Sequence, residues 1–447
     1  MINYQFFSLL LSQLLQFIRQ HFLTNNSTTT LYQGRNGQKM TILSLMLKLG
    51  IYTSALIGFF TMLPLKNNVT FTEYSLTPQR PLTGPLAINE KLSGISKLFE
   101  NQIVGPEGLL YYNNTLYTTL HYGHVVKIVD NEIVPVVKFG KVCDGLYDEH
   151  ICGRPLGLRM DKTGFLYVAD AYYGIFKVNL NPDQYGKKEQ LVSMDEVIDG
   201  VRPKLPNSVV IASDGTMYWT DSDTNYKLHD GIYTLFVDGT GRLLKYDPKT
   251  KRNTVLMKNL QFANGVELSD DESFILVSET AKYCIHKHYL KGPKTGKSEI
   301  FIDGLPGMPD NIKRNGRGSF YIPLVMPRFP IVDNIGKYPT IRMMITKSLL
   351  VIDFTLLKIN SLYPNLYCKK AMHWIGHFES LSFIKSITNQ RLSVLKVNEN
   401  GKVISSYHST DGKVTGICDV EVIDDKLYLG SPFNTFLGVI KLPQGFL

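Results

Sequence analysis

Five side-chain oxygen donors occupy similar places along the chain. Each lies in a turn-like segment, about ten positions ahead of a short, strand-like aromatic run. Carboxylate and amide oxygens are the ligands that calcium prefers, whereas zinc prefers histidine and cysteine, which these positions lack. The sequence therefore predicts a calcium site with the ligands Glu107, Asn207, Asn264, Asp310 and Asn311.

Each of these residues, taken alone, is explained by its turn. Asp310 and Asn311 end LPGMPDNI, in which two prolines and a glycine mark a tight loop, and Asp and Asn are common turn residues. The metal site is favoured because the donors recur in one register in four segments. Such a recurrence requires a fold that brings successive repeats to a common axis.

Short aromatic strands supply that repeat. They are centred on residues 117, 167, 218, 275 and 321, at spacings of 50, 51, 57 and 46 residues, and a sixth at residue 428 follows after 107 residues, about two periods. Repeats of roughly 40–50 residues made of short strands are typical of propeller blades. The pattern predicts an all-β fold, a six-bladed β-propeller over residues 96–447, whose equivalent positions point toward the axis.

The long last interval contains residues 326–390, which do not alternate as strands do. IRMMITKSLLVIDFTLL and CKKAMHWIGHF indicate apolar helices. We expect this insertion to cap one face of the propeller, and packing against the propeller is favoured over contact with a membrane.

The positive charge of the chain is concentrated at its N-terminus. Of the formal net charge of +9, residues 1–66 contribute +5, because they hold five Lys and Arg residues and no acidic residue. The other 381 residues carry +4, too little for a basic nucleic-acid-binding surface. We therefore expect no nucleic-acid partner.

The same region contains a candidate for a membrane span. Residues 49–65 are uncharged, and the wider run 40–66 is about as long as a bilayer requires. Lys and Arg are denser before this run than after it, so the positive-inside rule predicts a type II transmembrane signal anchor, with the propeller in the lumen of the endoplasmic reticulum or outside the cell. A cleaved signal peptide is the alternative. Residues 1–39 are then a cytosolic tail or a gene-model extension, and residues 67–95 a stalk.

The cysteines and sequons agree with such a compartment. Cys143 and Cys152 bracket a short polar segment that a disulfide could close in an oxidising environment. Asn68 and Asn113 are candidate N-glycosylation sites. The other cysteines, which we expect to be buried free thiols, are Cys284, Cys368 and Cys418.

The chain also resembles a known family. It is similar to the strictosidine synthase-like family, in particular its animal branch, in CGRPLGLRMDKTGFLYVADAYYGIFKV, FANGVELSDDESFILVSET and LPGMPDNI. The resemblance covers about residues 67–447. It implies a six-bladed propeller, a disulfide between Cys143 and Cys152 and type II topology. Related propellers, the paraoxonases and gluconolactonases, bind calcium on the axis through positions that match the five predicted ligands.

Two positions depart from the pattern of the family. Cys418 lies at or near the position of the late glutamate that true strictosidine synthase uses for its amine–aldehyde condensation, so this reaction is not expected. Asn207 is followed by Ser208, where relatives often have Asp. The second departure weakens the match of Asn207 to a calcium ligand.

The leading hypothesis is a membrane-anchored, calcium-dependent hydrolase of small esters or lactones. Calcium would polarise the substrate carbonyl and stabilise the oxyanion. His121 and His124 in LHYGHVVKI, or Asp310, are the candidate general bases. The chain has no GxSxG nucleophile elbow, which argues against a serine hydrolase. The alternative is a non-enzymatic receptor or adhesion propeller with structural calcium.

Overall fold

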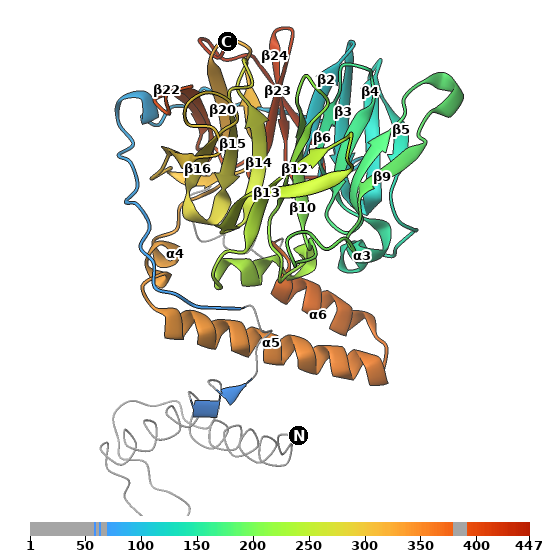
Figure 1. Ribbon diagram of the computed structural model, residues 1–447, viewed down its shortest axis with the longest axis vertical. Helices are drawn as coiled ribbons and strands as arrows, with labels where there is room; N and C mark the ends of the chain where they lie inside the picture. Colours follow the sequence, from blue (N-terminus) through green and yellow to red (C-terminus); the bar gives the residue numbers. More distant parts are fainter. Residues whose placement is uncertain (1–57, 60–61, 64–68, 379–390) are drawn as a thin grey trace, which may run out of the picture. The chain divides into compact units, whose positions relative to one another are not determined.

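Six antiparallel sheets, arranged as the blades of a β-propeller, make up most of the described chain and confirm the all-β prediction (Figure 1). The computed structural model describes residues 58–59, 62–63, 69–378 and 391–447. The chain forms two compact units, Met1–Met62 and Leu63–Leu447, and the propeller belongs to the second.

The predicted N-terminal features fall mostly outside the described residues. The tail at 1–39, nearly all of the anchor at 40–66 and the sequon at Asn68 cannot be compared with the structure. Among the residues that the structure describes, no helix combines the length and apolar character needed to cross a membrane.

Each blade is a meander whose innermost strand lies nearest the axis. Blades 1 to 3 are formed by β2 (Leu109–Tyr112), β3 (Thr115–Leu120), β4 (His124–Val129), β5 (Glu132–Lys138); β6 (Pro155–Met160), β7 (Leu166–Asp170), β8 (Gly174–Val178), β9 (Lys188–Val192); and β10 (Pro206–Ile211), β11 (Met217–Asp221), β12 (Gly241–Asp247), β13 (Arg252–Leu260). Blades 4 to 6 are formed by β14 (Ala263–Leu268), β15 (Phe274–Glu279), β16 (Cys284–Tyr289), β17 (Ser298–Ile302); β18 (Gly307–Pro309), β19 (Lys313–Arg314), β20 (Ser319–Pro327), β21 (Leu392–Asn398), β22 (Val403–Ser409); and β23 (Asp419–Ile423), β24 (Lys426–Gly430), β25 (Leu437–Lys441), β1 (Ser96–Leu98).

Short turns with left-handed residues join the strands of blade 1. Asn113 and Asn114, between β2 and β3, have φ of 46° and 57°, and Asp130 and Asn131, between β4 and β5, have φ of 51° and 63°. Asn and Asp tolerate this conformation, which two-residue hairpins require. Asn113 is exposed at its turn. Its glycosylation stays a prediction.

The aromatic residues of the repeat build the contacts between blades. Tyr117 of blade 1 packs with Leu158 and Val168 of blade 2. Tyr167 and Trp219 share the core between blades 2 and 3. Corresponding apolar clusters lie between all the remaining pairs of neighbouring blades, including blades 6 and 1. A single blade has too small a core of its own, so the repeat is stable only as a closed ring.

Blade 6 closes the ring by joining the two ends of the propeller. Its three inner strands come from the C-terminal end of the chain, and its outermost strand is β1. Ser96 pairs with Val439 and Leu98 with Leu437. The N-terminal strand therefore holds the last strand in place.

Residues 69–95, expected as a stalk, are instead packed against the propeller. Val69 and Phe71 pack with Tyr226 and Tyr233. Leu86 and Leu92 are buried in the cores of blades 4–5 and 5–6. These apolar side chains explain the difference, because burying them stabilises a docked segment over a solvated one.

The insertion within blade 5 separates β20 from β21 and forms helices. These are α4 (Pro330–Ile335), α5 (Pro339–Leu362) and α6 (Leu366–Gly376), and α5 and α6 lie together at one face of the propeller (Figure 1). Arg342 of α5 is fully buried and donates to the carbonyl oxygens of Phe236 and Thr72 and to the Asp238 carboxylate. Asp238 also accepts the backbone N–H of Thr72. One buried guanidinium thus joins the insertion, blade 3 and the N-terminal segment.

The predicted disulfide between Cys143 and Cys152 is present, and the other three cysteines are buried and free. It closes the loop that contains η3 (Leu146–Asp148) and α3 (Glu149–Cys152). The remaining 3₁₀ helices are η1 (Gly84–Leu86), η2 (His121–Gly123), η4 (Pro182–Gln184), η5 (Leu228–Leu235) and η6 (Thr280–Lys282).

Replacing both bridged cysteines by alanine is expected to lower the free energy of unfolding by about 2–3 kcal/mol, because the unfolded chain regains the freedom of a loop of about ten residues. Urea denaturation of the C143A/C152A variant measures the change. Reduced wild-type protein is the matched control and should show the same loss; equal stability of the oxidised protein and the variant would contradict the prediction.

Candidate functional site

One equivalent position in every blade lies beside the propeller axis. In blades 2, 3 and 4 it falls in a β-bulge, where the pairing of the innermost strand with its neighbour shifts. Bulges re-aim side chains and are frequent beside active sites. In blade order the residues at this position are Glu107, Leu156, Asn207, Asn264, Asp310 and Cys418.

Threonines on the second strands hold these bulges in place. In blade 3 the Thr220 hydroxyl accepts the N–H of Ser208 at 3.1 Å and donates to the carbonyl of Asn264 at 2.7 Å. Thr119 makes the same link from Gly108 to Leu156, at 2.9 and 2.8 Å. Each threonine thereby fixes the axial residue of the next blade.

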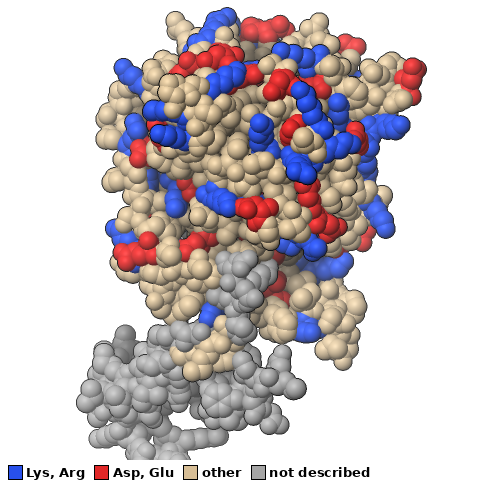
Figure 2. All heavy atoms as spheres, in the orientation of Figure 1, with Lys and Arg blue, Asp and Glu red and all other residues tan. Residues whose placement is uncertain are grey.

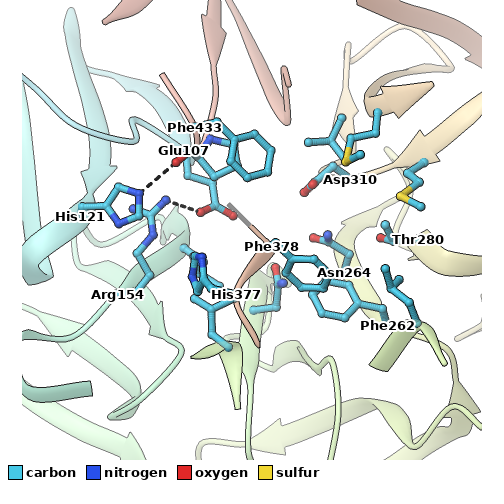
Figure 3. A pocket seen from close by; sticks show the side chains of 18 residues that line it. Glu107, His121, Arg154, Phe262, Asn264, Thr280, Asp310, His377, Phe378 and Phe433 are labelled. Carbon is cyan, nitrogen blue, oxygen red and sulfur yellow. Dashed lines mark hydrogen bonds and ion pairs between the residues drawn. The ribbon is translucent and has the colours of Figure 1, made fainter. Parts of the chain in front are cut away.

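Four of the five predicted ligands line one cavity. Glu107, Asn207, Asn264 and Asp310 all border a space of about 80 Å³, which has room for several water molecules. Glu107 and Asp310 point into it from opposite sides (Figure 3).

Asn311 belongs to a second layer, one residue further along the innermost strands. It lines a smaller cavity together with Lys313 and Asp419. The backbones of neighbouring blades approach closely in this layer: a Cβ on Gly265 would lie 2.4 Å from the carbonyl oxygen of Asp310. Successive residues of an extended strand point in opposite directions, so Asp310 and Asn311 do not face the same space.

The donor set of the first layer fits a calcium ion. Asn264 Oδ1 and Asp310 Oδ1 are buried, and neither has a hydrogen-bond partner in the described part of the chain. Buried polar atoms are normally paired, so two unpaired oxygens on one cavity require an explanation. A hard cation bound by two carboxylates and two amides would satisfy both oxygens.

The two carboxylates also have raised pKa values. Burial, which outweighs the nearby Arg154, raises the pKa of Glu107 to about 7. Burial, together with the charges of Glu107 and Asp419, raises the pKa of Asp310 well above its usual range. Both carboxylates therefore hold protons more readily than surface carboxylates do, and a bound cation would have to displace those protons.

Calcium affinity is therefore expected to decrease as the pH is lowered. A carboxyl group with a pKa of about 7 is mostly ionised at pH 8 and mostly protonated at pH 6. The apparent Kd for calcium should therefore be about tenfold or more higher at pH 6 than at pH 8. Isothermal titration in buffers of different ionisation enthalpy measures both the affinity and the protons released. A Kd that is independent of pH, with no proton release, would contradict the assignment of Glu107.

A second group of polar residues lies at the Glu107 side of the cavity. Arg154 donates to Glu107 Oε2 at 2.8 Å, and His121 Nδ1 lies 2.7 Å from Glu149 Oε1. His377 Nε2 is 3.5 Å from the other oxygen of Glu149. Burial raises the pKa of Glu149, but hydrogen bonds from His121 and His377 outweigh burial and hold it well below its usual range.

The two histidines predicted as bases lie in different surroundings. His121 borders the cavity, but its Nε2 is 2.9 Å from the carbonyl oxygen of Pro432, so both ring nitrogens face acceptor oxygens. His124, the first residue of β4, is only partly buried and does not line the cavity. The structure thus brings His121 and Asp310 together at the cavity and leaves His124 apart.

The apolar walls of the cavity come partly from the insertion. Phe378, two residues after the end of α6, stacks edge-to-face on Phe262 at 5.0 Å. Gly231 of η5 makes room for it, since a Cβ there would lie 2.4 Å from its ring. Met308 and Phe433 complete this side of the lining.

Arg154, Glu149, His377 and Phe378 were not predicted as site residues. Arg154 lies two positions before Leu156, the axial residue of blade 2. The spacing of the repeat could therefore have indicated that Arg154 lies close to the axis. Glu149 lies inside the loop bracketed by the two bridged cysteines. For His377 and Phe378 the sequence has no local signal, because the helical insertion brings them to the cavity from outside the repeat.

Two family models match the chain. The model described as "Strictosidine synthase" matches residues 207–293, and the model described as "Strictosidine synthase-like, N-terminal" matches residues 84–128. Both matched segments contain predicted calcium ligands.

Curated relatives match over most of the chain. Hemomucin of Drosophila melanogaster is 37% identical over 391 residues, which cover 86% of this chain and 66% of hemomucin. The adipocyte plasma membrane-associated protein is 34% identical in Gallus gallus, over 81% of each chain, and 33% identical in Homo sapiens, over 91% of each chain.

Solved structures with a similar arrangement share little sequence. A gluconolactonase from Xanthomonas campestris has a TM-score of 0.49 at 14% identity and covers 86% of this chain and 99% of its own. A calcium-binding protein, regucalcin, from Agrobacterium tumefaciens has a TM-score of 0.47 at 10% identity and covers 78% of this chain and 93% of its own.

Proposed function

The chain belongs to the family of the adipocyte plasma membrane-associated proteins, and from that membership and the axial site we propose that it is a membrane-anchored, calcium-dependent hydrolase of small esters or lactones. The observation that carries the proposal is the pair of buried, unpartnered oxygens of Asn264 and Asp310, which share a cavity with the Glu107 carboxylate. A bound calcium would supply a Lewis acid that polarises a carbonyl and stabilises its oxyanion.

We assign the general base to Asp310 in preference to the two histidines. Its buried Oδ1 has no hydrogen-bond partner in the described part of the chain, whereas the Glu107 carboxylate accepts from Arg154. His121 is less suitable, since both of its ring nitrogens are placed as donors to acceptor oxygens. In this assignment Asp310 takes the proton of the attacking water. Arg154 holds Glu107 in position, and Arg154 itself lies 3.8 Å from Glu149.

The substrate we propose is small and largely apolar. The lining consists mainly of apolar side chains, among them Leu156, Phe262, Met326 and Phe378, which exclude water from the ester group. The condensation of strictosidine synthase is not proposed. Cys418 offers no carboxylate, and its buried thiol lies 3.5 Å from the carbonyl oxygen of Glu107.

The second candidate is a cell-surface receptor or adhesion propeller in which calcium is only structural. The origin of the axial ligands favours it, because they come from four different blades, which a bound cation would hold together. In both candidates we propose that residues 40–66 span the membrane and that the propeller lies in the lumen or outside the cell. The exposed sequon at Asn113 and the disulfide support that side.

The test is hydrolysis by the full chain, expressed in a secretory host and purified in detergent. A panel of aryl esters and lactones is assayed with calcium, with a chelator, and with calcium restored. The proposal expects turnover that is lost on chelation and regained with calcium. Absence of turnover in a protein whose thermal stability rises with calcium would favour the receptor.

A further inference from the structure

The paired helices α5 and α6 carry an unusual number of exposed apolar side chains. Of the 19 large apolar side chains that are exposed among the described residues, 11 lie between residues 338 and 374. Apolar side chains exposed in this number within one segment mark a contact with another molecule or with lipid. We define the α5–α6 face as these residues: Tyr338, Ile341, Ile352, Phe354, Leu357, Ile359, Leu362, Tyr363, Leu366, Tyr367 and Trp374.

The two halves of α5 differ in what they contact. The first half is held by buried residues, namely Arg342, Thr346 and Lys347. The second half has apolar residues exposed on several sides, and Ile352 and Ile359 lie seven residues, about two turns, apart. The last turns of α5 therefore leave apolar surface without a protein partner in the described chain.

The composition of the segment favours a lipid surface over a second protein. Residues 337–376 contain six Lys and Arg residues and one acidic residue, Asp353. Arg342 and Lys347 are buried, which leaves Lys337, Lys358, Lys369 and Lys370 at the surface. Exposed Tyr and Trp beside Lys are enriched at membrane–water interfaces, whereas protein–protein interfaces are depleted in Lys. The part of this segment that is visible in Figure 2 is mostly uncharged, while acidic and basic side chains alternate over the propeller above it.

The N-terminal chain brings a bilayer within reach of this face. Val69 and Phe71 pack against the same buried cluster as Leu349 and Leu350 of α5, and the guanidinium of Arg342 lies 6.0 Å from the centre of the Phe71 ring. The uncharged apolar run of the proposed span ends at Leu65, four residues before Val69. Four residues reach at most about 14 Å. If the proposed span ends there, the membrane surface would lie within about 14 Å of Val69, which shares a cluster with α5.

We propose that the α5–α6 face lies in the interfacial region of the same bilayer that the N-terminal anchor spans. It is a second, peripheral contact with that membrane, with the apolar side chains among the upper acyl groups and the lysines at the headgroups. This inference rests on the proposed span, but it is independent of the proposed hydrolysis.

The chain offers a probe for this contact, because it has only two tryptophans. Trp374 is 62% exposed on the α5–α6 face, whereas Trp219 is fully buried between blades 2 and 3. The full-length chain and its W374F variant are reconstituted into phosphatidylcholine vesicles with plain or brominated acyl chains. The difference between their emission spectra belongs to Trp374, and residual Trp219 emission in W374F is the reference.

The proposal expects Trp374 emission to shift to shorter wavelength and to lose roughly half its intensity in brominated vesicles, because interfacial side chains lie about 5–10 Å deep. The double variant I352E/I359E, which changes two half-exposed side chains, should lose most of this quenching and keep the thermal stability of the parent. Both results together would support the contact.

Three other outcomes would overturn it. If the chain floats with vesicles but Trp374 is not quenched, the anchor is supported and the contact of the α5–α6 face is contradicted. A chain that does not float at all loses both. A blue shift that depends on protein concentration and not on bromine would show that the face pairs two copies. Hydrolysis is assayed on the same samples as a separate test, because none of these outcomes decides whether the chain is a hydrolase.

Discussion

Asp310→Asn is expected to lower the kcat/KM of calcium-dependent turnover by roughly 10²–10⁴-fold, the effect of losing a general base. The substitution keeps the shape of the side chain and removes one of two carboxylates from the axial cavity. Because burial and nearby charges raise the pKa of Asp310, its ionised form destabilises the calcium-free protein. The variant should therefore be at least as stable as wild type without calcium, and it should lose the increase in Tm that calcium produces.

Asn311→Ser is the matched control for this prediction. Asn311 is the next residue, it lies in the second layer, and blade 3 has Ser208 at the equivalent position. We expect this variant to keep both the calcium response and the turnover. If Asn311→Ser were as damaging as Asp310→Asn, the division of the axis into two layers would be wrong. If Asp310→Asn retained its calcium-dependent Tm, the metal site itself would be contradicted.

Breaking β1 is expected to have the largest effect on stability. Replacing Ser96, Lys97 and Leu98 by Gly, Pro and Gly keeps the chain length but removes the strand that pairs with β25. The loss should be about 3 kcal/mol or more, the cost of proline within regular structure plus that of two glycines. Thermal unfolding followed by circular dichroism measures it. The exposed edge of β25 should also make the variant prone to aggregation.

The outermost strand of blade 4 provides the control. Ser298, Glu299 and Ile300 of β17 are exposed, and their replacement by Gly, Pro and Gly also removes outer-strand pairing. All four strands of blade 4 are consecutive in the chain, so the ring stays closed. An equal loss of stability in the two variants would show that closure by β1 contributes nothing beyond one edge strand.

The blade repeat could be predicted because its aromatic residues do the same physical work in each blade. Tyr117, Tyr167, Tyr218 and Tyr321 all lie in cores shared with a neighbouring blade. The repeat therefore leaves a regular signal in the sequence. The first-layer donors could be predicted from the same repeat. Residues that lie the same number of positions ahead of the aromatic strand occupy equivalent places beside the axis in each blade.

Other parts of the site leave no periodic signal. Asp310 and Asn311 are neighbours in sequence, and only the direction of the strand decides which of them faces the cavity. His377 reaches the cavity from a helical insertion, and Glu149 from a loop held by a disulfide and by an ion pair of Asp148 with Lys369, at 2.9 Å. Contacts between distant segments of this kind depend on tertiary structure and not on spacing. For the same reason residues 69–95 were expected as a stalk, although they are packed.

The pairing of β1 with β25 also constrains how the protein is made. Ser96 is synthesised early and Val439 near the end, so the contact that completes the sixth blade joins the most distant strands of the chain. Non-local pairing of this kind slows folding. Five blades can form while synthesis continues, but the ring cannot close until the last strand has left the ribosome. During that interval β1 and the inner strands of blade 6 are exposed edges, and we expect the nascent chain to depend on chaperones of its compartment then.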